Sequence, residues 1–372
     1  MSYCSPKNSL NRYTCFSNKL LINFANIYNS TNDDKIKLYD IEELNNNDSK
    51  RFELWKDIKK KMLTTECKED VCILKDKTIN SKVDKKELEN TFRPVKPIEW
   101  NQNKYQWLST TDISQVMKQY ENLYHDFIFI GPVPMDFDRK VPYLLNMCVS
   151  DDLCNINISK LFKKDKTKIG IIFNLDNHDQ SGSHWVSMYA DLLKGSIYYF
   201  DSYGNPPKQE VKKLIDRIKT QGNDLIVKNK LDTKKFPSTV FDFKKINNKT
   251  IEILNNTQIA GNNIKYEIKK DDLLELTVSD KPLFIKINDI NNDTIHLSKN
   301  IEKNTDSSFS HKCFKAYFNS NRWQYGGSEC GVYSMHFIEE NLTGKEFNTI
   351  VNTRVNDEDI NKKRDFYYRP NI

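Results

Sequence analysis

The sequence predicts an α+β fold with a helical front part and a β-rich segment inside its second half. Three observations predict it. Apolar residues recur at helical spacing before residue 95, short apolar runs bounded by turn residues follow Phe127, and alternating runs fill residues 225–305. At 372 residues the chain is long enough to bury a sizeable core.

The front part, residues 1–95, is expected to be a helical accessory region. Ser17 can cap a first helix that ends near Asn29. The apolar residues that share one face of this helix are Leu20, Phe24, Ile27 and Tyr28. A second helix is expected over about 48–63, and the charged, poorly periodic stretch 75–90 predicts a linker.

The next segment carries a clear helical pattern followed by a strand. Thr110 or Thr111 can cap a helix that runs to about Tyr124. Phe127–Ile130 then forms a short apolar run, which predicts a buried strand that Gly131-Pro132 stops.

Three further strands and a helix are expected in the centre of the chain. The strands are predicted over 171–175, 185–189 and 197–200, and the break at 191–195 indicates a hairpin between the last two. A helix over about 208–220 should follow.

Residues 225–305 change character and predict a small antiparallel β module, inserted within a main unit that spans 96–372. Its alternating runs cover 251–254, 264–268, 274–278, 283–287 and 294–297.

Bulk composition limits the class of protein. A hydrophobic content of 38% is compatible with a packed protein, and the net charge of +6 permits an anionic partner without implying one. The eight cysteines show no disulfide-framework spacing, which favours free thiols in a reducing compartment. No apolar run reaches the roughly 18–20 residues that span a bilayer, so a soluble protein without membrane insertion is expected.

The segment 324–331, which reads Gln-Tyr-Gly-Gly-Ser-Glu-Cys-Gly, predicts a nucleophile. Cys330 precedes an apolar helical run, so its thiol should lie at a helix N-terminus, where the thiolate is favoured. Gln324 can supply an amide donor for an oxyanion hole. This pattern is typical of a cysteine hydrolase.

Upstream residues complete the predicted site. His184 opens one strand and Asp201 closes the next, so an antiparallel hairpin should bring base and orienting carboxylate to the same end. Trp185 and Gly331 are expected to line the substrate channel. The chemistry calls for no metal and no cofactor.

Several residues compete with this assignment. His178 and His336 are alternative bases, whereas Asn174, Asp176 and Asp191 are alternative orienting groups. None of these three ends the strand after His184. Elsewhere, Cys67 and Cys72 have the spacing of half a metal site, but no second pair accompanies them. Gly326-Gly327 is either a turn beside the nucleophile or a self-cleavage site, and the turn is favoured.

Four segments resemble the ubiquitin-like-protein-specific, or SUMO-protease-like, cysteine proteases: 107–110, 183–186, 199–202 and 324–333. The intervals of 17 residues from His184 to Asp201 and of six from Gln324 to Cys330 match the family pattern. The resemblance covers about 100–224 and 306–370. It implies a papain-like core in rearranged order, because the cysteine comes last.

Within that family, the segment 127–137 and the helical front part look most like the virion-maturation proteases of large cytoplasmic DNA viruses, which are similar to the adenovirus-type protease. This resemblance implies cleavage of structural polyproteins at Gly-Gly-Xaa or related sites. It also implies protein substrates, and a location in the virion and the host cytoplasm. Nucleic acid and virion core components are further candidate partners.

Two other functions stay open at this point. One is a deconjugase that removes a ubiquitin-like modifier of the SUMO type. The other is a non-catalytic scaffold that binds capsid or DNA, against which the complete set of candidate catalytic residues argues.

Overall fold

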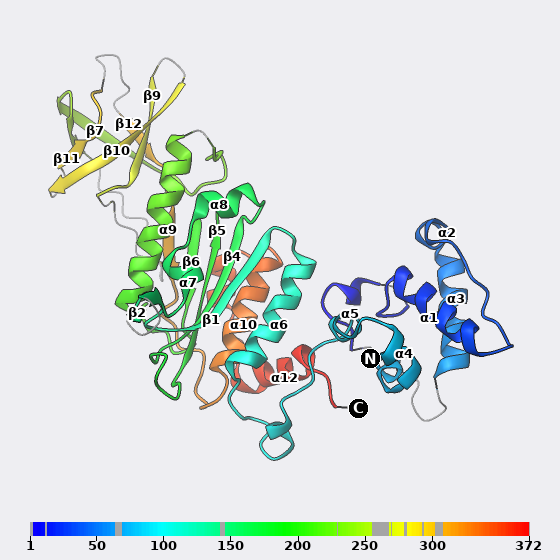
Figure 1. The fold of residues 1–372 in the computed structure, drawn as a ribbon. Helices are drawn as coiled ribbons and strands as arrows, with labels where there is room; N and C mark the ends of the chain where they lie inside the picture. Colours follow the sequence, from blue (N-terminus) through cyan, green and yellow to red (C-terminus); the bar gives the residue numbers. More distant parts are fainter. Residues whose placement is uncertain are drawn as a thin grey trace. The chain divides into compact units, whose positions relative to one another are not determined.

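The computed structural model describes residues 3–11, 13–63, 69–141, 146–228, 230–254, 268, 270–278, 281–291, 294–301 and 308–371. They divide into two compact units, Met1–Tyr124 with Glu358–Ile372 and His125–Asp357. Helices and strands are mixed, as predicted (Figure 1). The predicted boundaries at 95/96 and at 225–305 stay predictions. None of the described helices combines the length and the apolar character that a membrane crossing requires.

The first unit is helical over its described residues. Its helices are listed in chain order: η1 Asn8–Leu10, α1 Asn18–Thr31, α2 Ile41–Asn46, α3 Asp48–Met62, η2 Asp70–Lys75, α4 Lys77–Lys82, α5 Lys85–Asn90, η3 Ile98–Asn101, α6 Thr110–Leu123 and α12 Asp357–Tyr367. The predicted helices over 17–29 and 48–63 are confirmed as α1 and α3, and the Ser17 side chain accepts from the Leu20 N–H. α6 is capped by Ser109 rather than by Thr110 or Thr111.

The linker predicted over 75–90 is wrong. Asp76 caps α4 and Asp84 caps α5, each by accepting backbone N–H groups of the first turn. Each short helix also buries one apolar side chain, Ile79 or Leu88, in the core of the N-terminal helices. Tertiary packing therefore stabilises helices that are too short and too charged to show periodicity.

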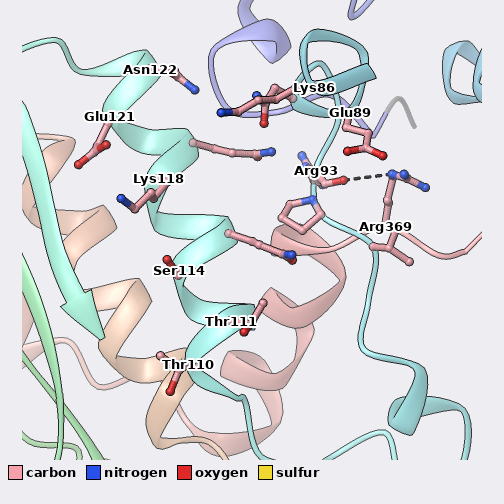
Figure 2. A pocket seen from close by; sticks show the side chains of 15 residues that line it. Lys86, Glu89, Arg93, Thr110, Thr111, Ser114, Lys118, Glu121, Asn122 and Arg369 are labelled. Carbon is pink, nitrogen blue, oxygen red and sulfur yellow. Dashed lines mark hydrogen bonds between the residues drawn. The ribbon is translucent and has the colours of Figure 1, made fainter. Parts of the chain in front are cut away.

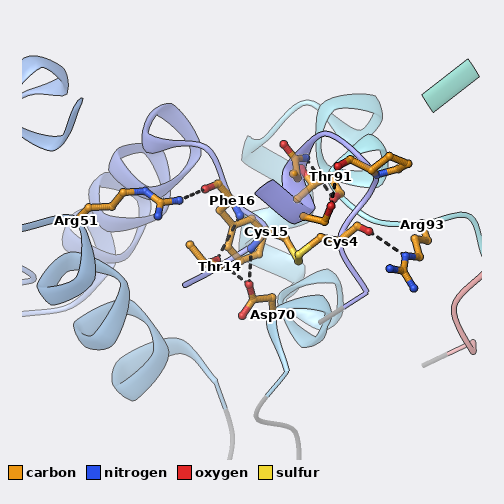
Figure 3. Close-up of a disulfide and its surroundings, with 11 residues drawn as sticks. Cys4, Thr14, Cys15, Phe16, Arg51, Asp70, Thr91 and Arg93 are labelled. Carbon is orange, nitrogen blue, oxygen red and sulfur yellow. Dashed lines mark hydrogen bonds between the residues drawn. A yellow bond between two sulfur atoms is a disulfide. The ribbon is translucent and has the colours of Figure 1, made fainter. Parts of the chain in front are cut away.

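A disulfide joins Cys4 to Cys15 in this unit (Figure 3). Asp70 supports it, because its Oδ2 accepts from the Cys15 N–H at 2.7 Å and from the Thr14 hydroxyl at 2.6 Å. The second unit contains another disulfide, Cys148–Cys154. The expectation of free thiols is therefore wrong for these four residues. Each pair is brought together by local folding, which cysteine spacing alone does not reveal.

The second unit is built on a five-stranded sheet in the order β1-β4-β5-β6-β13. The strands are β1 Phe127–Pro134, β4 Lys168–Asn174, β5 Trp185–Asp191, β6 Ser196–Phe200 and β13 Lys315–Phe318. The outer pairs, β1 with β4 and β6 with β13, are parallel, and the inner pairs are antiparallel. Every residue of β5 and β6 is buried, which fits a sheet covered on both faces.

Two long helices cover this sheet. α9 Gln209–Val227 contributes Val211, Leu214 and Ile218 to the same core as Val186 and Met188 of β5. α10 Cys330–Leu342 packs on β4 and β5. Shorter elements complete the unit: β2 Lys140–Val141, β3 Met147–Cys148, α7 Asp151–Cys154, α8 Ile158–Lys163 and α11 Phe347–Asn352.

The predicted end of the first strand at Gly131-Pro132 is wrong. β1 runs on to Pro134, because Val133 pairs with Phe173 after a register irregularity. Such an irregularity accommodates a proline, which has no N–H for the ladder.

The β-rich segment folds as a closed barrel in the order β10-β11-β8-β7-β12-β9. The strands are β7 Thr239–Asn247, β8 Thr250–Ile253, β9 Leu273–Val278, β10 Lys281–Asn291, β11 Thr294–Leu297 and β12 Ser308–His311. Four predicted strands are confirmed as β8 to β11. Of the predicted run 264–268, residues 264–267 lie outside the described residues.

Candidate active site

His184 and Asp201 meet at one end of the β5–β6 hairpin. The antiparallel pairing ends with Ser187 opposite Phe200, so the start of β5 and the end of β6 lie at the same end of the hairpin. The Nε2 of His184 lies 2.7 Å from Oδ1 of Asp201, and both residues are buried. The hairpin thus brings together the two residues that the sequence places at strand ends.

Cys330, which lies far along the sequence from this pair, completes the candidate site. It is the first residue of α10, is only 1% exposed, and forms a hydrogen bond with His184. Because Nε2 of His184 faces Asp201, the ring nitrogen directed at Cys330 is Nδ1. The partial positive charge of the helix N-terminus favours an anion at this sulfur.

The environment of His184 favours its charged form. Burial lowers the pKa of His184, the hydrogen bonds to Asp201 and Cys330 raise it, and the net result is a pKa of about 9. The imidazole is therefore protonated at neutral pH. Since an imidazolium favours the thiolate of a neighbouring cysteine, the pair combines a nucleophile with a proton donor.

The ring of Tyr203 stacks on the imidazole of His184, a contact that the sequence analysis did not predict. The two ring centroids are 4.5 Å apart and the planes differ by 15°. The Arg322 guanidinium also lies over the Tyr203 ring, 5.1 Å from the ring centre. The position of Tyr203 in the turn after β6, two residues beyond Asp201, is the signal that could have found it.

Asn319 fixes the backbone of Asp201 and was also missed. Its Oδ1 accepts from the Asp201 N–H at 2.9 Å, and its Nδ2 donates to the Asp201 carbonyl at 2.7 Å. Asn319 is fully buried just after β13. The parallel pairing of β13 with β6 brings together residues 118 positions apart, so a local sequence pattern could not predict this contact.

Gln324 is buried beside this site and its amide is oriented by two groups. Its Oε1 accepts from the Ser202 hydroxyl at 2.7 Å, while its Nε2 donates to the Gly326 carbonyl at 3.0 Å. The second Nε2 hydrogen has a long contact of 3.5 Å with Glu329. That weaker contact is the one an oxyanion can replace. The oxyanion role of Gln324 stays a prediction.

The two predicted channel residues are both buried. Trp185 begins β5 with 5% of its surface exposed, and Gly331 is the second residue of α10. Their contact with substrate stays a prediction.

The competing residues have other partners. His178 pairs with Asp136 at 2.7 Å in a loop, and His336 lies within α10, 3.6 Å from Glu339. Asp176 accepts from the Ser183 hydroxyl, Asn174 from the Ser183 N–H, and Asp191 from the backbone of the hairpin turn.

Among the described residues, a buried group that could hold a metal ion is Asp272, His311 and Cys313, whose ligand atoms lie within 4.8 Å of one another. Lys219 lies 3.4 Å from Asp272, and burial followed by the charges of Lys315 and Lys219 holds the pKa of His311 well below its ordinary value. These ammonium groups oppose a cation. Of the two cysteines with the spacing of half a metal site, Cys67 lies outside the described residues and Cys72 is disulfide-bonded.

A large pocket of about 850 Å³ lies in the first unit, and none of the candidate triad residues lines it (Figure 2). It is lined by polar and charged side chains of α5 and α6, among them Lys86 and Lys118. Arg369 closes one side and donates from Nε to the Arg93 carbonyl at 3.1 Å. The size of a pocket therefore does not identify the candidate active site in this protein.

Comparison with known families and sequences connects this geometry with proteases. Residues 154–258 match the Ulp1 protease family, C-terminal catalytic domain. The matched part contains His184 and Asp201 but ends before Gln324 and Cys330. A thiol protease of Acanthamoeba polyphaga mimivirus is 27% identical across 99% of this chain and 94% of the relative.

African swine fever virus supplies a second sequence relative and a structural one. Its SUMO-1 cysteine protease is 28% identical over 37% of this chain and 50% of the relative, so the chain spans about half the length of that protein. A crystal structure of the protease of this virus aligns with a TM-score of 0.52 and 17% identity, covering 100% of this chain and 96% of the other. That likeness shows a shared fold.

Proposed function

The chain carries a catalytic domain of the Ulp1 cysteine protease family and is a cysteine peptidase, and we propose that it processes viral structural precursors at Gly-Gly-Xaa sites. The observation that carries the proposal is the contact of His184 with both Asp201 and Cys330 at the start of α10. The core is papain-like in rearranged order, with the cysteine last in the chain.

The proposed reaction is acyl transfer through the thiol. The Cys330 sulfur attacks the carbonyl carbon of the scissile bond, and the Gln324 amide with nearby backbone N–H groups binds the resulting oxyanion. The C–N bond breaks as His184 gives its proton to the leaving amine. Water then hydrolyses the thioester, with His184 accepting a proton from it and Asp201 stabilising the imidazolium.

The limited access to the Cys330 sulfur supports small substrate residues on the N-terminal side of the scissile bond. Cys330 is 1% exposed and His184 6% exposed, so little room surrounds the reacting sulfur. Glycines, which have no side chain, are the residues whose backbone approaches most closely. The mimivirus relative, which spans almost the whole chain, supports viral precursors as the substrates.

Mapping new N-termini tests this function. Candidate structural precursors are incubated with the wild-type chain and with Cys330→Ala, and the termini are read by mass spectrometry. The proposal expects cuts after Gly-Gly-Xaa that are absent with the variant. Cuts at unrelated sequences would contradict it.

A second candidate is removal of a ubiquitin-like modifier. It is favoured by the name of the African swine fever virus relatives, which are called SUMO-1 cysteine proteases. Cleavage of a SUMO fusion but of no Gly-Gly-Xaa peptide would select this function.

We also propose action in the virion and in the host cytoplasm, with nucleic acid or virion core components as partners of the accessory regions. Deleting residues 1–95 should then impair processing of native precursors more than cleavage of short peptides. Equal rates on precursors would count against such docking.

A further inference from the structure

An exposed tyrosine lies between two arginines beside the candidate active site. Tyr325 is 64% exposed, and the guanidinium groups of Arg322 and Arg354 lie 4.8 Å and 4.7 Å from the centre of its ring. Both arginines are exposed as well. We call these three residues the Tyr325 ledge.

Hydrogen bonds to the backbone hold the ledge in place. The N–H groups of Tyr325 and Gly326 both donate to Asp357 Oδ2 at 2.8 Å. Nε of Arg322 donates to the Gln324 carbonyl at 2.7 Å, and Nε of Arg354 to the Trp323 carbonyl at 2.9 Å. The ledge is therefore ordered before any partner arrives, which lowers the entropy cost of binding.

A continuous stack connects the ledge with the catalytic histidine. Arg322 lies over both Tyr325 and Tyr203, and Tyr203 stacks on His184. Gly327, on the same loop, is exposed and has open space where a side chain would be. A polypeptide whose scissile bond lies at Cys330 would thus pass close to the ledge.

The two guanidinium charges are not neutralised locally. Within the described ranges, no carboxylate lies within ion-pair distance of Arg322 or Arg354. The nearby acid Asp357 is engaged by two backbone N–H groups and by the Tyr333 hydroxyl, and Glu329 is buried. Each arginine still has its terminal nitrogens to offer, which suit a carboxylate in the two-point geometry typical of arginine.

We propose that the Tyr325 ledge binds an acidic side chain of the substrate within a few residues of the cut. The proposal rests on the proposed peptidase function and adds a specificity element to it. Two positive charges with no carboxylate partner among the described residues supply the charge complementarity, and the tyrosine offers a flat apolar surface for the stem of a glutamate. A protein segment is favoured over nucleic acid because the ledge adjoins the catalytic stack.

Paired peptides test the proposal. A single glutamate is moved through the four positions on each side of the cut in a Gly-Gly-Xaa peptide, each with a glutamine twin, and kcat/KM is measured for every pair. At one or two neighbouring positions the wild type should prefer glutamate by about three- to tenfold. Raising the salt concentration from about 0.05 to about 0.5 M should reduce that preference.

Arg354 is the residue to change, because it touches Tyr325 without contacting Tyr203. Arg354→Gln should abolish the preference and Arg354→Glu should invert it toward a lysine peptide, and the readout is the ratio of kcat/KM within each pair rather than the absolute rate. Lys212→Gln, which removes an exposed charge from α9, is the matched control and should retain the preference.

Three outcomes would overturn the proposal. If the wild type cut the glutamate and glutamine peptides equally at all positions, the proposed role of the ledge would be refuted, but the peptidase function would not. If no Gly-Gly-Xaa peptide were cut, the proposed cleavage specificity and the ledge would fail together. Inhibition by a short single-stranded DNA that is lost in Arg354→Gln, without any glutamate preference, would assign the ledge to nucleic acid.

Discussion

The Nε2 of His184 lies 2.7 Å from Oδ1 of Asp201, which leaves Nδ1 as the ring nitrogen for the hydrogen bond with Cys330. The carboxylate therefore determines which nitrogen faces the sulfur. It also stabilises the charge that the imidazole carries when it is protonated. The orientation of the His184 imidazole depends on this buried hydrogen bond, and its charge depends on this bond together with the one to Cys330.

Replacing Asp201 with asparagine should therefore impair catalysis more than folding. Asparagine keeps the size of the side chain but loses the charge that stabilises the imidazolium. We expect kcat/KM to fall by about 10²- to 10⁴-fold. The unfolding transition, followed by circular dichroism, reports the fold independently. A variant that stays folded and fully active would show that another group orients His184.

The pH dependence of kcat/KM should reveal His184. Its pKa of about 9 means that the imidazolium persists at neutral pH and is lost as the pH rises through 9. Activity should fall there, because the leaving amine loses its proton donor. In Asp201→Asn the decline should move to lower pH, since a bond that raises the pKa is removed. An alkaline limb at the same pH in both proteins would contradict this assignment.

The same proton contributes to folding stability. The folded pKa of His184 lies above its ordinary value of 6.5. The proton's contribution is therefore complete below pH 6.5 and is lost as the pH rises through 9. Urea unfolding measured between pH 6.5 and 9 should show that the free energy of unfolding of the wild type falls as the pH rises. The fall should be smaller in the control variant His184→Gln.

Gln324→Ala should lower kcat by about 10²- to 10³-fold if its amide binds the oxyanion. Ser202→Ala is the matched test of orientation, because the Ser202 hydroxyl donates to Oε1 of Gln324. It should cause a smaller loss of kcat with little change in KM. Unaltered kcat in Gln324→Ala would leave the oxyanion to backbone N–H groups alone.

Gly222 in α9 should not tolerate a side chain. A Cβ there would lie 2.3 Å from Cε2 of Phe314, which is fully buried. Gly222→Ala should therefore lower the free energy of unfolding by about 1–3 kcal/mol, despite the better helix propensity of alanine. Gly327→Ala, where a Cβ meets nothing within 4 Å, should change it by less than about 0.5 kcal/mol. Equal effects in urea unfolding would contradict this packing argument.

The local pattern of apolar residues was enough to predict the secondary structure around the candidate site in the second unit. β5 and β6 are short apolar runs and α10 is a longer one, and all three have clear ends, so the placement of His184, Asp201 and Cys330 at those ends followed from the sequence. The helices α4 and α5 were missed, because their stability comes from two buried side chains and two aspartate caps rather than from periodicity.

Contacts between distant segments could not be predicted in the same way. Asn319 reaches Asp201 only because β13 pairs with β6, and the stack of Arg322 on Tyr203 depends on the same pairing. Such contacts belong to the tertiary structure alone.

The central claim is that Cys330 is a nucleophile activated by His184. The most direct measurement is labelling of the chain with a thiol-directed peptide electrophile under reducing conditions, with the site and rate read by mass spectrometry. The account predicts a single modification at Cys330, absent in Cys330→Ala and slowed by at least about 10²-fold in His184→Gln. Failure of the wild type to label, or labelling of Cys330 at the same rate without His184, would contradict it and favour a non-catalytic scaffold.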